Sequence, residues 1–351
     1  MKRIKQSVCI LLTAVLFVVT LAGCSMTEEK KINDSTSADN IIITETGDIV
    51  QKLPQPQATA EPEPTEAADT QTQPTAEPEV TAPDVQLAEP EQEQVITQED
   101  QIEPTESELQ IVFLGDSIFD NNRDGTGVPY LTAVQCEADV YNLAIAGTCA
   151  TIESTEEYEN EKWTSRGLTG IVKAMRGEIS TDIFEGTRTK EILDNKKIDW
   201  SATDYFVIEY GINDFFKATP LSDPDDFYDQ RTYAGALRYA ITNLRSCAPD
   251  ATIILCGPHY SQFFAGDSRF IGDGNTLNTG YGTLFDYKGI CQYVSNEQET
   301  EFLDAYMDLG INSYSADQYL EDGVHLTQEG RQLYADALAK IILNYEETKN
   351  N

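Results

Sequence analysis

The chain has 351 residues, of which 60 are Asp or Glu and 24 are Lys or Arg, so its formal net charge is −36. A protein that binds nucleic acid through phosphate contacts needs clustered cations, and this balance excludes that class. It also argues against adsorption to an anionic membrane through a basic face.

The first 24 residues predict export. A short basic start precedes an apolar run from Val8 to Ala22, which is typical of a secretory signal peptide and too short for a stable membrane span. The segment ends Leu-Ala-Gly-Cys at residues 21–24, which resembles the lipobox of bacterial lipoproteins. The resemblance implies a signal peptide at 1–23, lipidation of Cys24, and a place on the outer face of the cytoplasmic membrane, held by acyl chains alone.

Residues 24–109 predict a disordered acidic tether. Nine of the 14 prolines lie between Pro54 and Pro104, among Glu, Thr, Gln and Ala. Such a composition cannot bury enough apolar surface to offset the entropy of ordering the chain. The isoleucine run at 41–43 is an exception, but it is too short to form a core. We expect a spacer that lets a domain work away from the bilayer.

Residues 110–346 predict one folded domain, followed by a tail at 347–351. Apolar runs of strand length alternate with stretches of helical period, and the runs are nearly continuous, as in parallel strands covered on both faces. We expect strands in QIVFLGDS, ADVYNLAIAG, DYFVIEYGIND, ATIILCGPHY and, more weakly, EFLDAYMDL, and helices at 231–250 and 326–347. The pattern predicts an α/β fold: a three-layer α/β/α sandwich with a mainly parallel, flavodoxin-like sheet of about five strands.

Polar residues gather where the expected strands end, which is the edge where such sheets bind ligands. Ser117 follows the first strand, Gly147 the second and Asn213 the third. Nucleophilic serine catalysis needs a hydroxyl, a base and a carboxylate that orients the base. The chain has two histidines, and His325 has Asp322 three residues before it. These residues are therefore candidates for a Ser-His-Asp site.

Four sequence blocks, FLGDSI, NLAIAG, YGIND and DGVHLT, occur in the order found in the SGNH (GDSL-type) hydrolase superfamily. The chain resembles that superfamily over essentially the whole domain. The resemblance implies a serine esterase with Ser117 as nucleophile, His325 as general base and then acid, and Asp322 as its orienting partner. It also implies an oxyanion hole made by the backbone N–H groups of Ser117 and Gly147 and the side-chain amide of Asn213.

Each site residue also has a plainer interpretation as a helix cap or turn former. The coincidence of four blocks at one sheet edge favours catalysis instead. Four further residues are candidates for the substrate site: Asp116, Asp214, His259 and Trp163. His259 is also a rival base by residue type, but no carboxylate lies at a comparable spacing from it, which favours a partly buried histidine at a strand end.

No metal or cofactor is expected. The five domain cysteines and two histidines show no Cys-x₂-Cys or His-x₃-His spacing, and there is no glycine loop of the kind that binds phosphate. The number of cysteines is odd, and the sequence leaves their pairing open; they are Cys136, Cys149, Cys247, Cys256 and Cys291.

Two long segments, 151–189 and 261–290, follow expected strands and would set specificity. Their aromatic and amide groups suit contacts with sugars, and neither shows a broad apolar cap. We therefore expect an exported serine esterase that removes small O-acyl groups, chiefly acetyl, from carbohydrate. Three alternatives stay open: a lysophospholipase or lipid esterase, an O-acyltransferase at the same site, and a non-catalytic glycan-binding lipoprotein.

Overall fold

The computed structural model describes residues 41–43, 49–51, 109–153 and 159–349. The predicted signal peptide, Cys24 and most of the predicted tether lie outside these residues. Two short strands lie within the tether range: β1 (Ile41–Ile43) pairs with β2 (Ile49–Gln51) in an antiparallel sheet. The isoleucine run does not by itself predict a strand, because three apolar residues do not reveal a partner strand.

The centre of the domain is a five-stranded, all-parallel sheet in the order β4-β3-β5-β6-β9. All five predicted strands are present, with the bounds Leu109–Gly115 (β3), Ala138–Asn142 (β4), Tyr205–Glu209 (β5), Thr252–Cys256 (β6) and Glu301–Leu303 (β9). The central strands β3, β5 and β6 are buried along most of their length. Their continuous apolar sequences are explained by this burial on both faces.

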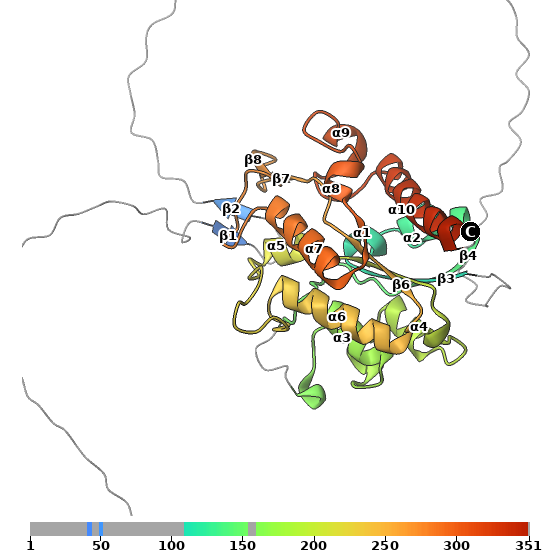
Figure 1. Cartoon of the computed structure of the whole chain (residues 1–351). Helices are drawn as coiled ribbons and strands as arrows, with labels where there is room; N and C mark the ends of the chain where they lie inside the picture. The colour runs from blue at the N-terminus through green and yellow to red at the C-terminus, as the bar shows by residue number, and fades with distance from the viewer. Residues whose placement is uncertain (1–40, 44–48, 52–108, 154–158, 350–351) are drawn as a thin grey trace, which may run out of the picture. The chain divides into compact units, whose positions relative to one another are not determined.

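Helices cover both faces of the sheet (Figure 1). One layer contains α2 (Val128–Cys136) and α10 (Gln328–Lys349), and the other contains α3 (Leu168–Met175), α6 (Tyr233–Cys247) and α7 (Leu284–Gln298). The chain steps from β3 to β4 in one direction and through β5, β6 and β9 in the other, and right-handed connections then place the helices on opposite faces. The predicted three-layer α/β/α class and flavodoxin-like strand order are confirmed.

Shorter elements complete the described chain. They are α1 (Ser117–Asp120), α4 (Arg188–Asp194), α5 (Ile212–Phe216), α8 (Ala305–Asp308), α9 (Ala316–Tyr319), the hairpin strands β7 (Gln262–Phe264) and β8 (Phe270–Asp273), and 3-10 helices at Asn160–Lys162, Thr181–Phe184 and Trp200–Ala202. The β7–β8 hairpin and α3 lie in the two long segments, 261–290 and 151–189, that follow expected strands.

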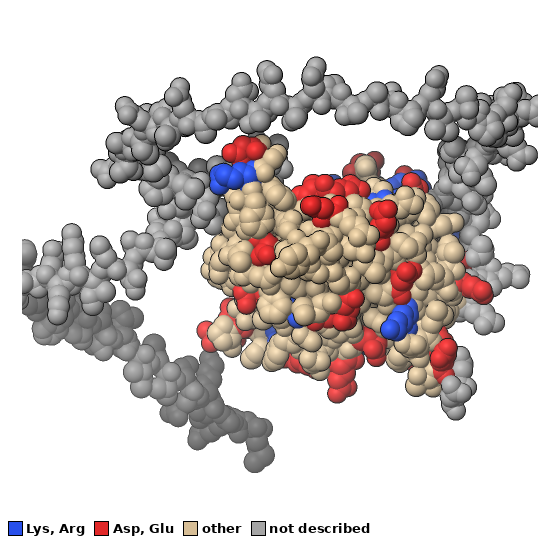
Figure 2. All heavy atoms as spheres, turned by 90° about the horizontal axis from the view of Figure 1, so that it is seen from above, with Lys and Arg blue, Asp and Glu red and all other residues tan. Residues whose placement is uncertain are grey.

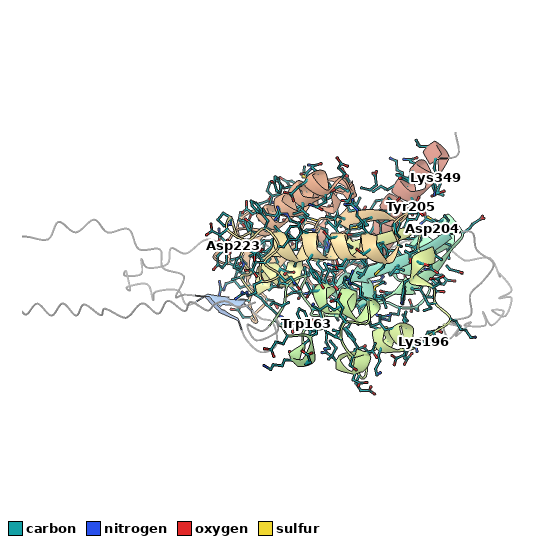
Figure 3. All side chains as sticks on the ribbon, turned by 60° about the horizontal axis from the view of Figure 1, so that its bottom comes forward. Trp163, Lys196, Asp204, Tyr205, Asp223 and Lys349 are labelled. Atoms are coloured by element: carbon teal, nitrogen blue, oxygen red, sulfur yellow. The ribbon has the colours of Figure 1, made fainter. Side chains whose placement is uncertain are left out.

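Local sequence explains where the longer helices begin. Thr232 accepts a hydrogen bond from the Gly235 N–H at the start of α6, and Thr283 forms a reciprocal capping box with Asp286 at the start of α7. At the far end of the domain, Tyr205 lies near the C-terminal end of α10, where its hydroxyl donates to Glu346 (Figure 3). This contact joins the amino edge of the sheet to the last helix.

Acidic side chains outnumber basic ones on the face seen in Figure 2, in keeping with the negative charge of the chain. Among the residues that the structure describes, no helix combines the length and the hydropathy needed to cross a membrane.

The strand order creates a switch point between β3 and β5, where successive connections leave in opposite directions. In open sheets of this kind, ligands bind beyond the carboxyl ends of the strands at such a point. β3 ends two residues before Ser117, and β5 ends four residues before Asn213. The fold therefore brings the predicted site residues to one crevice.

Candidate active site

Ser117 is the first residue of α1, directly beyond the carboxyl end of β3. Asp116 caps this helix, because its Oδ1 accepts the Ile118 N–H at 3.0 Å. The strand-to-helix turn places Ser117 in the wall of a cleft, although the residue is only 9% exposed. The nucleophile candidate is thus held on a capped helix rather than on a loop.

His325 lies between Ser117 and Asp322. Its Nε2 is 3.0 Å from the Ser117 Oγ, and its Nδ1 is 2.7 Å from the Asp322 Oδ2. The other Asp322 oxygen, Oδ1, accepts the backbone N–H groups of Val324 at 3.0 Å and His325 at 2.8 Å. With a proton on Nδ1, Nε2 can accept the serine proton. The three predicted residues therefore meet in an order that can activate a hydroxyl.

The pKa values of this pair move in opposite directions. Burial alone would raise the pKa of Asp322, but the hydrogen bonds from the His325 ring and from the backbone N–H groups hold it well below its usual range. The hydrogen bond to Asp322 raises the pKa of His325 above its ordinary value, against the effect of partial burial. The carboxylate therefore stays ionised and favours a proton on the imidazole.

Gly323 allows the Asp322–His325 turn to lie against the β7–β8 hairpin. Its φ is +91°, and a Cβ at this position would lie 2.3 Å from the Gln262 carbonyl oxygen and 2.8 Å from the Phe264 ring. The Gln262 N–H in turn donates to the Gly323 carbonyl at 2.8 Å. Glycine is thus required both by the backbone conformation and by the close approach of the two chain segments.

We expect Gly323→Ala to lower kcat/KM for an acetyl ester by about 10²-fold or more, because a displacement of the base of about 1 Å has that effect. Gly186→Ala is the matched control: its φ is +82° and a Cβ there meets nothing within 4 Å. The control should lose about 1–2 kcal/mol of stability and keep its activity. Equal activity of the two variants would contradict a requirement for this close contact.

Two backbone N–H groups at the cleft are candidates for donors to an oxyanion. Ser117 and Gly147 both line the cleft, and Gly147 has a φ of +75°. Neither the Ser117 nor the Gly147 N–H donates a hydrogen bond to the described part of the chain. Both donors are therefore available to a ligand.

The third predicted donor is already engaged. Asn213 Nδ2 donates to the Asp116 Oδ2 at 2.9 Å and to the Thr148 carbonyl at 3.1 Å. These two bonds place the Asn213 amide at the cleft but use both of its hydrogens. A bond to an oxyanion would have to replace or share one of them.

Three buried carboxyl groups lie behind the site: Asp116, Glu209 and Asp214. Burial raises the pKa of all three. Burial and the neighbouring Asp116 charge together raise the pKa of Glu209 well above its ordinary value. Asp116 also accepts hydrogen bonds from the Ile118 N–H and the Asn213 amide.

The cleft has a volume of about 1090 Å³. Its walls combine residues from the ends of β3, β4 and β5, from the β7–β8 hairpin and from the segment before α10. They include Ser117, Asn121, Ala146, Gly147, Asn213, Phe216, Lys217, Gln262, Phe263, Phe264, Ser268, Asp317, Leu320, Glu321 and His325. The sequence blocks found the catalytic candidates but not the hairpin residues, whose only signal was aromatic composition.

None of the four candidate substrate-site residues lines the cleft. Asp116 and Asp214 are fully buried, and Asp214 accepts hydrogen bonds from Ala150 and Thr151, which ties the loop after β4 to α5. His259 is also buried, as the sequence favoured. These residues support the walls of the site and do not form them.

The expectation that Trp163 contacts the substrate is not supported by its position. Its side chain is 5% exposed, its Nε1–H donates to the Ser165 carbonyl at 2.9 Å, and the Lys173 ammonium lies 4.7 Å from its ring centre. Figure 3 shows it in the segment that leads to α3. The expectation fails because aromatic composition does not distinguish a buried packing residue from a ligand platform.

Within the described ranges, no cluster of His, Cys, Asp and Glu could hold a metal ion, and Cys136, Cys149, Cys247, Cys256 and Cys291 form no disulfide. The chemistry derived above uses only side chains and backbone groups of the chain.

The chain resembles known proteins in sequence and in fold. The GDSL-like Lipase/Acylhydrolase family profile matches residues 113–333. No curated protein matches the chain. Similar solved structures include Est24, a carbohydrate acetylesterase from Sinorhizobium meliloti, with 12% identity over 68% of this chain and 99% of that one and a TM-score of 0.42.

A family two carbohydrate esterase from Clostridium thermocellum, in complex with cellohexaose, has 20% identity over 70% of this chain and 66% of that one, with a TM-score of 0.43. A lipase/acylhydrolase from Enterococcus faecalis has 17% identity over 67% and 95%, with a TM-score of 0.40.

The family match covers well over half of the chain and includes all four sequence blocks that meet at the cleft. The chain belongs to the GDSL-like lipase/acylhydrolase family and is a carboxylic ester hydrolase.

Proposed function

We propose that this hydrolase removes small O-acyl groups, chiefly acetyl, from carbohydrate through an acyl-enzyme. In the first step, His325 takes the Ser117 proton while Oγ attacks the ester carbonyl, and the leaving alkoxide receives that proton. In the second step, His325 activates a water that attacks the acyl-serine, which releases the acid and restores Ser117. Asp322 keeps the imidazole in the required tautomer.

The observation that carries this mechanism is the chain of contacts from Asp322 to His325 at 2.7 Å and from His325 to Ser117 at 3.0 Å. Both distances lie within hydrogen-bond range for a nucleophile and its base before substrate binds. The free N–H groups of Ser117 and Gly147 supply donors for the oxyanion.

Asn213→Ala should lower kcat by about 10²–10³-fold if its amide is the third oxyanion donor, because that is the usual effect of removing one such donor. KM should change little, since the charge on oxygen develops in the transition state. Steady-state kinetics with p-nitrophenyl acetate give both constants, and a melting curve shows whether loss of the Asp116 and Thr148 bonds unfolds the variant. A change in KM alone would contradict the assignment.

The composition of the cleft supports a carbohydrate substrate. The walls combine polar side chains such as Asn121, Gln262 and Ser268 with aromatic rings, and such a mixture suits a sugar ester. Phe264 and Phe270 are 39% and 53% exposed on the β7–β8 hairpin, and their ring centres lie 5.8 Å apart. Exposed rings beside hydrogen-bonding groups suit the apolar face and hydroxyls of a sugar.

The substrate class is tested with p-nitrophenyl esters of increasing acyl length and with O-acetylated oligosaccharides. We expect the highest kcat/KM with acetyl, and acetate released from the oligosaccharides. A preference for long acyl chains would overturn the proposal in favour of a lipid esterase. Transfer of the acyl group to an added sugar in preference to water would identify an acyltransferase.

We also propose that the enzyme works outside the cell, tethered through lipidated Cys24. The support is the lipobox-like sequence at 21–24 followed by the acidic, proline-rich stretch. Cys24→Ser should move the protein from the membrane fraction to the soluble fraction of expressing bacteria, and the wild type should incorporate labelled palmitate. Membrane association that is unchanged in the variant would refute the anchor.

A further inference from the structure

The turn that carries the base is held from two sides. On the side of α10, the Arg331 guanidinium donates to the Leu326 carbonyl at 2.7 Å. On the other side, the segment that follows β6 provides two donors: the Gln262 N–H to the Gly323 carbonyl, and the His259 ring to the Val324 carbonyl, both at 2.8 Å. Arg331 and His259 are thus the two side-chain donors to this turn that lie outside the four sequence blocks, and only the His259 bond reaches the peptide next to His325.

The protonation of His259 follows from its surroundings. A carbonyl oxygen can only accept, so Nε2 must carry the hydrogen. Burial lowers the pKa of His259 to about 4, so the ring is neutral under ordinary conditions. Its Nδ1 is buried and has no partner among the described residues. The single bond to Val324 is therefore the polar contact that the ring makes.

The bond from His259 to Val324 holds the peptide unit directly before the candidate base, His325. The Val324 carbonyl belongs to the peptide unit that joins Val324 to His325, and the N–H of the same unit donates to the Asp322 Oδ1 at 2.8 Å. The plane of this peptide is thus fixed at both ends, by His259 and by Asp322. The orientation of this peptide unit determines the position of the His325 Cα. It therefore also determines the distance between the His325 ring and Ser117.

We propose that His259 is a positioning residue for His325: its Nε2–H holds the peptide before the base so that the imidazole stays within reach of Ser117. The inference rests on the proposed role of His325 as the base. It assigns His259 no contact with substrate, because the residue is buried and absent from the cleft wall.

The test uses the full-length chain with p-nitrophenyl acetate and three variants. His259→Phe keeps a ring but removes the donor, and His259→Gln restores an N–H that can reach the Val324 carbonyl. Trp163→Phe is the control, because it removes another buried ring N–H donated to a backbone carbonyl, at Ser165, away from the cleft. Melting temperatures are measured for all three.

We expect kcat to fall by about 10–10²-fold in His259→Phe, with KM within about twofold of wild type, since misplacement of the base affects the transition state. His259→Gln should recover most of the loss. Trp163→Phe should melt at a lower temperature with kcat unchanged.

The pKa of His325, measured from the pH dependence of kcat/KM, gives a second test. The groups that face His325 are Asp322, Asp116, Glu321 and His259. His259 is neutral in the working range, so its replacement changes geometry and not charge. A looser contact with Asp322 should shift the midpoint of the pH–kcat/KM curve downward in His259→Phe and back in His259→Gln, and the proton resonance of the His325–Asp322 bond should follow.

Wild-type kcat in His259→Phe, or equal losses in the Phe and Gln variants at equal melting temperatures, would overturn the inference. Ser117→Ala, assayed in parallel, separates this outcome from failure of the proposed function. An active Ser117→Ala would refute the serine mechanism, whereas an inactive Ser117→Ala beside a fully active His259→Phe would refute only the positioning role.

Discussion

Ser117→Ala should lower kcat for p-nitrophenyl acetate by about 10⁶-fold, the loss found when the nucleophile of a serine hydrolase is removed. The reason is that the acyl-enzyme cannot form, and what is left is the effect of binding and of the oxyanion donors. Ser117 contributes little to stability, because its side chain bonds only to His325 within the described chain. The melting temperature should therefore stay close to that of wild type.

The double variant Ser117→Ala, His325→Ala should be no slower than Ser117→Ala alone. The two residues act as a unit, so losing one already removes the contribution of the other. Rapid mixing with an excess of enzyme provides a further check, since wild type should release a burst of p-nitrophenol equal to the number of sites. Multiplicative losses in the double variant would mean that His325 acts on something other than Ser117.

The sequence predicts the sheet and the reactive groups well, for a physical reason. Strands covered on both faces need continuous apolar sequence, so β3, β5 and β6 are recognisable without their neighbours. Parallel strands also place their carboxyl ends at one edge, so motifs 208 residues apart, those of Ser117 and His325, can be predicted to meet.

The walls of the cleft could not be predicted in the same way. Phe264 and Trp163 are both aromatic residues in long segments that follow expected strands. Phe264 is partly exposed at the cleft, whereas Trp163 is buried and packs against Lys173. Phe264 belongs to the β7–β8 hairpin, which contacts the Gly323 turn, whereas Trp163 precedes α3. Side-chain burial on irregular segments carries no periodic signal.

Glu209 is a second kind of residue whose place in the structure could not be predicted from the sequence. It is the last residue of an apolar strand, where the sequence does not show whether an acid is exposed. The structure shows that it is buried and close to the Asp116 carboxyl group. Asp116, whose charge raises the pKa of Glu209, joins α1 to Asn213 through its two carboxylate oxygens. Asp116, Asp214 and His259 thus hydrogen-bond to the segments that carry the site residues, and none of the three lines the cleft.

The second large effect is expected in Asp322→Asn, which should lower the plateau of kcat by about 10⁴-fold because the amide favours the wrong imidazole tautomer. In wild type, kcat/KM should rise with pH as His325 loses its proton, since only the neutral ring accepts from Ser117. The Asp322 bond raises the pKa of His325, so the midpoint should lie above the ordinary value of about 6.5.

Removal of the Asp322 charge should move this midpoint downward, so that the variant is both slower and less sensitive to mild acid. The shift will be incomplete, because Asp116 and Glu321 also raise the pKa of His325. Asp250→Asn, just before β6 at the amino edge of the sheet, is the control and should leave rate and midpoint unchanged. A variant with wild-type midpoint but reduced rate would show that Asp322 orients the ring without setting its proton affinity, whereas an unchanged rate would remove Asp322 from the mechanism.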